Sequence, residues 1–175
     1  MLKWSLIILG VVLGLIALVA LIGALLPRGH VASGRAKYRQ PPRRLWEAIS
    51  DFAAWPAWRK DIKAVERGED LDGRPVWVEV SSRGRMPLAV EVMEAPSRMV
   101  TRIADKKLPF GGTWTFEIVE SDGGATLTIT EDGEIYNPVF RFMARFIFGY
   151  RGTLEGYLAA LGKKFGEEVT VEPLR

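Results

Sequence analysis

The chain has 175 residues with 24 Lys and Arg, 21 Asp and Glu, one His and no Cys, which gives a formal net charge of +3. The absence of cysteine excludes disulfides and thiolate metal sites, and it fits either redox compartment. The small net charge comes without a recognisable nucleic-acid-reading motif, so we expect no nucleic-acid partner.

The first segment is an apolar run from Trp4 to Leu26, 23 positions without a charge, Pro, Asn or Gln. At about 1.5 Å per residue a helix of this length reaches roughly 34 Å, enough to cross a hydrocarbon core of about 30 Å. A cleaved signal peptide is the alternative, but its apolar region is about 7 to 15 residues. The best cleavage candidate, Val31-Ala32-Ser33, lies beyond Pro27. We predict that residues 1–29 form an uncleaved, single-pass transmembrane anchor.

Basic residues flank this run unevenly. Only Lys3 precedes it, and six follow it closely: Arg28, Arg35, Lys37, Arg39, Arg43 and Arg44. The excess predicts a cytoplasmic C-terminal domain, although long segments translocate with little regard to charge. Residues 27–67 carry a net +6 and residues 68–175 a net −4. The basic part fits a domain that hugs anionic membrane lipids, and equally an ordinary solvated surface.

The remaining residues, about 145, suit one domain. We expect a strand over Val31–Tyr38, a helix from Pro42 to Ser50 and a short helical turn within Phe52–Lys60. From Lys63 to Tyr136, short alternating runs are separated by turn dipeptides, which predicts an antiparallel meander. These dipeptides are Asp72-Gly73, Arg83-Gly84, Ala95-Pro96, Gly111-Gly112 and Gly123-Gly124.

Period-2 alternation predicts which side chains face the core. The expected inward set is Val76, Val78, Val80, Leu88, Val90, Val92, Trp114, Phe116, Ile118, Leu127 and Ile129. The expected water-facing set is Glu79, Glu91, Thr115, Glu117 and Thr128. Such a division is typical of an antiparallel sheet that is covered on one side.

A long C-terminal helix from Pro138 to Phe165 supplies the cover, with Asn137 as its N-cap. Its apolar stripe consists of Met143, Ile147, Tyr150, Leu154, Tyr157, Leu158, Leu161 and Phe165. Gly149, Gly152 and Gly156 predict a bend or break near its middle, because glycine disfavours helix interiors by about 1 kcal/mol.

Two stretches resemble the START or polyketide cyclase-like (SRPBCC) superfamily. The first is Leu45-Trp46-Glu47-Ala48-Ile49-Ser50-Asp51, leading to Trp55-Pro56-Ala57-Trp58; the second runs from Thr130 through Pro138 into Phe140-Arg141-Phe142. The resemblance covers about Val31 to Phe165 and implies an α+β helix-grip fold, in which an antiparallel sheet wraps around a long C-terminal helix. The domain would span residues 30–168, with a tail at 169–175. The fused anchor resembles bacterial membrane-tethered relatives.

The resemblance also implies an apolar cavity between sheet and helix for a lipid, an isoprenoid quinone or a similar ligand. Its expected lining is Val90, Trp114, Phe116, Leu127 and Ile129 on the sheet and Met143, Phe146 and Tyr150 on the helix. The alternative is that all eight simply pack as core. The polar candidates are Glu79, Glu91, Arg102, Glu131 and Tyr136. Continued alternation would point Glu131 inward, where its carboxylate needs a partner such as Arg102 or a raised pKa. The alternative is a sheet-edge carboxylate in water.

Catalytic signals are sparse. No metal constellation, phosphate loop or elbow serine is present, so we expect no metal and no cofactor. His30 reads as a linker residue beside the anchor. A cyclase or dehydratase-type enzyme would use Glu131 or Tyr136 as its acid or base.

Aromatic residues near cations suggest membrane contact. Trp55 and Trp58 precede Arg59 and Lys60, a combination that suits a bilayer interface. A small core cluster is the alternative. The same two alternatives, membrane contact or core, apply to Phe140, Phe142, Phe146 and Phe148.

Three functions remain open from the sequence. The leading hypothesis is a membrane-tethered binding or transfer module for a hydrophobic ligand, with membrane lipids as partners. The second is a regulatory or interaction protein that uses exposed aromatics or the Gly10-x-x-x-Gly14 spacing. The third is the cyclase or dehydratase-type enzyme.

Overall fold

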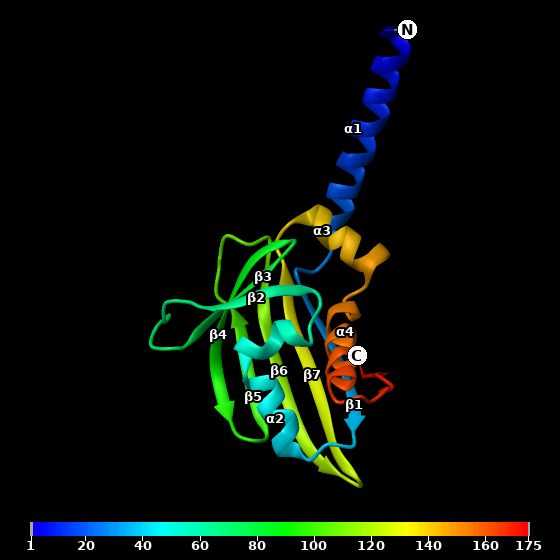
Figure 1. Ribbon diagram of the computed structural model, residues 1–175. Coiled ribbons are helices and arrows are strands. Elements are labelled where there is room, and N and C mark those ends of the chain that lie inside the picture. Colours follow the sequence, from blue (N-terminus) through cyan, green and yellow to red (C-terminus); the bar gives the residue numbers. More distant parts are fainter. Residues whose placement is uncertain (1, 175) are drawn as a thin grey trace.

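The computed structural model describes residues 2–174 as an apolar helix that projects from an α+β domain (Figure 1). The helices and helical turns are α1 (Leu2–Leu25), α2 (Pro42–Ser50), the 3-10 turn η1 (Phe52–Ala57), α3 (Pro138–Met143), the π-helical turn η2 (Ala144–Phe148) and α4 (Gly152–Lys164). The strands are β1 (Gly29–Tyr38), β2 (Ile62–Arg67), β3 (Val76–Ser81), β4 (Gly84–Glu94), β5 (Arg98–Ile103), β6 (Phe110–Ser121), β7 (Gly124–Ile135) and β8 (Glu172–Pro173).

The strands form one antiparallel sheet in the order β2-β3-β4-β5-β6-β7-β1-β8. Strands β2 to β7 are a meander, and β1 pairs with β7 from Gly29↔Glu134 to Tyr38↔Ala125. The short strand β8 adds to β1 at Gly34 and Arg35, so residues 172–173 belong to the sheet. The α+β helix-grip fold expected from the sequence is therefore confirmed.

One face of the sheet, here called the inner face, is covered by α2, η1 and α4. Its core residues are buried together with Leu45 and Ile49 of α2 and Leu154, Leu158 and Leu161 of α4. The sheet has an α1 end, where β1 begins and β7 ends, and an α2 end, where β1 leads into α2 (Figure 1).

Alternation predicts the inner face correctly on β6 and β7 but fails on two other strands. On β3, Trp77 pairs with Leu88 and Glu79 pairs with Met86, and Glu79 is buried while Val78 and Val80 are only half-buried. A bulge between Val90 and Val92 turns Val92 to the outer face. The predicted inward positions of Val76, Val78, Val80 and Val92 are therefore wrong, because strand register overrides local pattern. Gly111-Gly112, expected to form a turn, lies inside β6.

The predicted C-terminal helix is broken in its middle, as the glycines indicated. Gly149 has a positive φ of 72° and ends η2, and α4 restarts at Gly152. Asn137 Oδ1 caps α3 by accepting a hydrogen bond from the Phe140 backbone N–H at 3.1 Å. The break lets α4 lie on the inner face while α3 packs beside the end of α1 (Figure 1).

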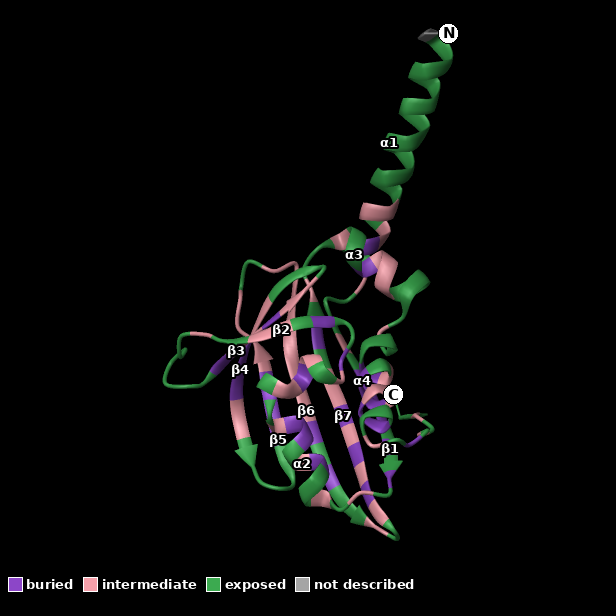
Figure 2. Ribbon diagram, viewed as in Figure 1, coloured by how far each residue is buried: buried purple, intermediate pink, exposed green. Residues whose placement is uncertain are grey.

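Helix α1 is long and apolar enough to cross a bilayer, with a mean hydropathy of 3.1 in its most apolar window, and it is almost entirely exposed (Figure 2). Its length and composition fit both a membrane anchor and a signal sequence. It meets the domain along its last two turns, where Val19 and Ala20 are half-buried and Gly23 lies against the Pro138 backbone.

Candidate functional site

Polar side chains gather on the inner face at the α1 end of the sheet. His30 is the second residue of β1 and lies opposite Gly133 of β7. Because Gly133 has no side chain, the imidazole can lie directly over the strand, and a Cβ at this position would come within 2.4 Å of His30 Cε1. The expectation of His30 as a linker residue is therefore wrong: it is an ordered strand residue.

His30 forms a compact group with Glu131 and Tyr150. Its Nε2 lies 3.4 Å from Glu131 Oε1, and its side chain is 11% exposed against 21% for Glu131. The Tyr150 ring stacks on the imidazole at 4.1 Å between centroids and an angle of 18°. The buried Nδ1 has no hydrogen-bond partner among the described residues. This arrangement leaves one imidazole nitrogen able to bind a polar group.

A second polar group lies nearby on the inner face. Arg59 donates through Nη1 to Glu79 Oε1 at 2.6 Å and through Nη2 to Asp61 Oδ2 at 2.8 Å. Its guanidinium carbon also lies 5.1 Å from the ring centroids of both Trp55 and Tyr157. Burial raises the pKa of Glu79, and Arg59 offsets this only in part. One guanidinium thus serves two carboxylates inside the protein.

Three buried donors around Arg59 lack partners. They are Arg59 Nε, Trp58 Nε1 and the Tyr157 hydroxyl, and no described residue satisfies them. Burial raises the pKa of Tyr157, so its hydroxyl stays protonated and can donate. Since most buried polar groups are hydrogen-bonded, several orphans in one place indicate a position for a polar group from outside the chain, either water or ligand.

Trp114 lies between the two polar groups. It pairs with Glu131 across β6 and β7, and its ring lies 6.1 Å from that of Tyr157. It is half-buried, as are Trp58, Met86, Ile103 and Tyr150, which pack at the margin of the core. The α1 end of the inner face therefore combines partly exposed apolar surface with unpartnered polar atoms.

The residues expected to line one cavity lie in three different environments. Val90, Phe116, Leu127 and Ile129 are closed core, none of them more than 7% exposed. Trp114 and Tyr150 lie beside the His30–Glu131 pair. Met143 and Phe146 leave the sheet with α3 and η2, and Phe146 is 58% exposed.

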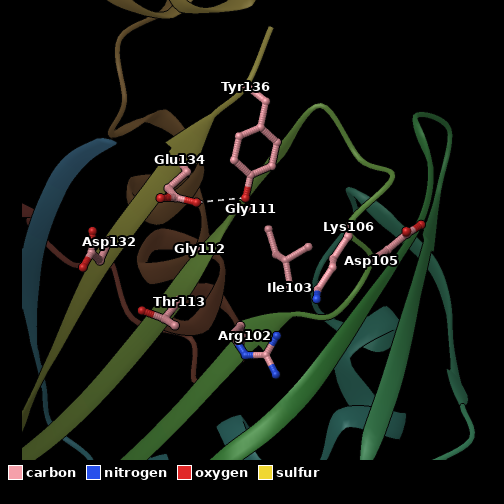
Figure 3. A pocket seen from close by; sticks show the side chains of 10 residues that line it. All are labelled: Arg102, Ile103, Asp105, Lys106, Gly111, Gly112, Thr113, Asp132, Glu134 and Tyr136. Carbon is pink, nitrogen blue, oxygen red and sulfur yellow. Dashed lines mark hydrogen bonds between the residues drawn. The ribbon is translucent and has the colours of Figure 1, made fainter. Parts of the chain in front are cut away.

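Two shallow hollows stand out among residues 2–174, and neither lies between the sheet and α4. The first, of about 300 Å³, is at the α1 end and is bordered by Arg102, Lys106, Asp132, Glu134 and Tyr136 among others (Figure 3). The second, of about 290 Å³, lies at the α2 end beside Pro41. The preformed apolar cavity expected between sheet and helix is therefore not one of the hollows that stand out in the described chain.

The first hollow contains two of the expected site residues, but they do not approach Glu131. Arg102 donates through Nε to Glu91 Oε1 at 2.6 Å, so the expected Arg102–Glu131 pair is wrong and His30 is the partner instead. The Tyr136 hydroxyl donates to Glu134 Oε2 at 2.9 Å, which raises the pKa of Tyr136. Tyr136 and Glu131 are thus separate groups, not one catalytic pair.

Of the two tryptophans expected at a membrane, Trp55 belongs to the core and Trp58 packs at its margin. Trp55 is 1% exposed, and its Nε1 donates to the Ile49 carbonyl at 3.2 Å. Trp58 packs edge-on against Tyr157 at 5.3 Å. The expected bilayer contact is therefore wrong for the buried Trp55, and that of the half-buried Trp58 stays a prediction. His30 and Arg59 were missed as site residues; continuing the β1 alternation back from Ala32 would have pointed His30 inward.

Sequence and structure comparisons agree on the family. Residues 35–166 match the family described as "Polyketide cyclase / dehydrase and lipid transport". The chain belongs to this family. No curated protein matches the sequence significantly.

Solved structures show the same fold. A START superfamily protein from Mycobacterium smegmatis superposes with a TM-score of 0.61 at 21% identity, over 77% of this chain and 96% of that one. A conserved protein from Geobacillus kaustophilus gives 0.65 at 13% identity, over 82% and 99%. The Mll3558 protein from Rhizobium loti gives 0.57 at 26% identity, over 75% and 96%. The domain is thus START-like, and the family indicates ligand binding or cyclase/dehydrase-like chemistry.

Proposed function

We propose that this protein is a membrane-tethered module that binds an amphipathic ligand, such as a lipid or an isoprenoid quinone, at the α1 end of its inner face. The His30–Glu131–Tyr150 group carries the proposal. An imidazole and a carboxylate set on an apolar face are costly unless they are paired or used. One imidazole nitrogen is paired with Glu131, and the other has no described partner.

The protonation of the His30–Glu131 pair suggests which ligand group would bond to His30 Nδ1. If Nε2 carries the proton that faces Glu131, then Nδ1 of the neutral imidazole is an acceptor and suits a hydroxyl on the ligand. A protonated imidazole would instead donate from Nδ1 to a carbonyl or an anionic oxygen. The half-buried Trp114, Ile103 and Met86 would contact the apolar part of the same molecule.

Entry to Nδ1 requires Tyr150 to move, because its ring covers the imidazole. Tyr150 directly follows Gly149, whose φ of 72° marks the break between η2 and α4. A short break of this kind can absorb a change in backbone angles. The ligand would enter beside the end of α1, where a membrane-embedded molecule is nearest.

Lipid mass spectrometry tests the proposal. The full chain, extracted from membranes in a mild detergent, should retain an amphipathic compound. Glu131→Gln and Gly133→Ala should reduce its amount about tenfold, the second because the added methyl displaces the imidazole. Glu117→Gln is the matched control, since Glu117 is exposed on the next strand. Equal retention in all variants, or no compound with the wild-type chain, would refute the proposal.

The second candidate is a cyclase or dehydratase-type enzyme, which the family description and the His30–Glu131 pair both favour. An imidazole beside a carboxylate can shuttle a proton to a bound substrate. The enzyme reading predicts that the retained compound is chemically altered by the wild-type chain and bound unaltered by His30→Gln. Identical products with both chains would exclude it.

A further inference from the structure

The segment between β7 and α4 exposes an unusual amount of apolar surface. Five large side chains stand out of α3 and η2: Val139 is 37% exposed, Phe140 52%, Phe146 58%, Ile147 60% and Phe148 68%. Residues 138–151 also hold three arginines and no acidic residue. Soluble proteins rarely expose contiguous apolar surface of this kind without a partner.

The segment packs against the C-terminal end of α1. Gly23 of α1 lies so close to Pro138 that a Cβ there would overlap the Pro138 carbonyl oxygen. The buried Arg141 reaches back across the junction, and its Nη1 donates to the Leu26 carbonyl at 2.8 Å. This bond also satisfies a carbonyl at the C-terminal end of α1, where a cation is favoured. Helix α3 is therefore fixed at the level where the apolar run of α1 ends.

A bilayer crossed by α1 would reach this level. The exposed rings of α3 and η2 then lie where acyl chains meet headgroups, and Arg145 and Arg151 lie where anionic headgroups bind. Figure 2 shows α3 beside the lower end of α1, and η2 follows α3 directly along the chain.

We infer that α3 and η2 form an interfacial wedge, defined as Pro138–Phe148, that inserts into the same leaflet surface from which α1 emerges. This inference rests on α1 lying in a membrane, as proposed above, and it adds a second contact that fixes the orientation of the domain. The wedge ends two residues before Tyr150. The Tyr150 ring, which covers His30, would therefore lie next to the lipid.

Single-cysteine spin labels test the wedge, and the chain has no native cysteine to remove. The full chain carries one label at Leu13 in α1, Ile147 in the wedge, or Val119, which is 65% exposed on β6. It is reconstituted in vesicles of phosphatidylcholine and phosphatidylglycerol. Labels at 13 and 147 should collide more with oxygen than with a water-soluble nickel chelate, and the label at 119 should show the reverse.

Each other outcome overturns the inference in a distinguishable way. If the label at 13 reports lipid but that at 147 matches 119, the wedge fails and the tether stands. If the label at 13 reports water, tether and wedge both fail. If the label at 147 is shielded from both reagents, a protein surface such as a second copy covers the segment.

A protease measurement checks the same point without substitutions. Tryptic cleavage after the exposed Arg145 should slow at least tenfold in these vesicles relative to detergent solution. Cleavage after the exposed Arg83 in the β3–β4 turn should keep its rate. Equal rates at Arg145 in both media would count against the wedge.

Discussion

The two ends of the inner face differ in kind. At the α2 end, α2 and α4 close over Tyr38, Ala125 and Leu127, and the Tyr38 hydroxyl donates to the Leu158 carbonyl at 2.9 Å. At the α1 end, α3 turns away from the sheet toward α1, and buried polar atoms of His30 and Tyr157 have no hydrogen-bond partner among the described residues. The α2 end is therefore closed core, and the α1 end keeps polar atoms that a ligand could bind.

The difference follows from where the C-terminal helix breaks. A continuous helix would carry its apolar stripe along the whole sheet and bury the α1 end as core. The break at Gly149 limits the cover to α4, and the Tyr150 ring stacks on His30 just after the break. Core variants at the α2 end should therefore change stability without changing ligand retention.

The largest loss of stability is expected from Arg59→Met, which leaves Glu79 buried without its partner. Removing one member of a buried ion pair costs about 3 to 5 kcal/mol, and chemical denaturation should show it. The double variant Arg59→Met with Glu79→Leu should recover much of this loss. The exposed pair Arg85–Glu66 supplies the control: Arg85→Met should change stability little. A loss in the double variant as large as in the single one would show that the ion pair is not the cause.

Leu158→Ala tests the α2 end, where the side chain is fully buried. Truncation in such a core costs about 2 to 5 kcal/mol through lost burial and a residual cavity. The ligand co-purified per folded chain should stay unchanged. Leu71→Ala, at an exposed loop position, is the matched control and should be nearly neutral. Loss of ligand in Leu158→Ala would contradict the separation of the two ends.

Asn137→Ala should cost less, about 1 kcal/mol, because it removes the N-cap of α3. The effect should be local. A spin label at Ile147 should become more mobile while the label at Val119 keeps its line shape. Asn137→Ser, which can also cap a helix, should restore the wild-type spectrum. Equal mobility in all three chains would show that the cap does not hold α3.

The smallest effect is a pH dependence at Glu79. Burial raises its pKa in the folded state above the ordinary 4.5, so the folded chain holds this proton more tightly than the unfolded chain does. Its contribution to stability should therefore fall as the pH rises from 4.5 through the raised pKa. Glu79→Gln should flatten the stability profile in that window, and Glu117→Gln should not. An unchanged slope in Glu79→Gln would mean that this carboxyl titrates normally. Asp61, whose pKa is lowered mainly because bonding to Arg59 outweighs its burial, acts in the opposite direction at lower pH.

The candidate site was only partly predictable. The alternation that ends with Leu127 and Ile129 pointed Glu131 inward, and the structure places it there. Its partner was missed because the alternation of β1 was not followed back to His30. Glu79 was placed on the wrong face because three valines on β3 gave a convincing pattern, yet the register with β4 turns Trp77 and Glu79 inward.

By itself the sequence determined what depends on local order along the chain: the apolar helix, the meander, the capped start at Asn137 and the break near Gly149. These follow from side-chain periodicity and from the backbone preferences of glycine and proline. Only the tertiary structure decided what depends on packing between distant segments: the bulge that turns Val92 outward, the burial of Val90, Phe116, Leu127 and Ile129 in the core, the His30–Glu131 contact and the docking of α3 on α1. Such contacts join residues up to about a hundred positions apart, and no local pattern encodes their register.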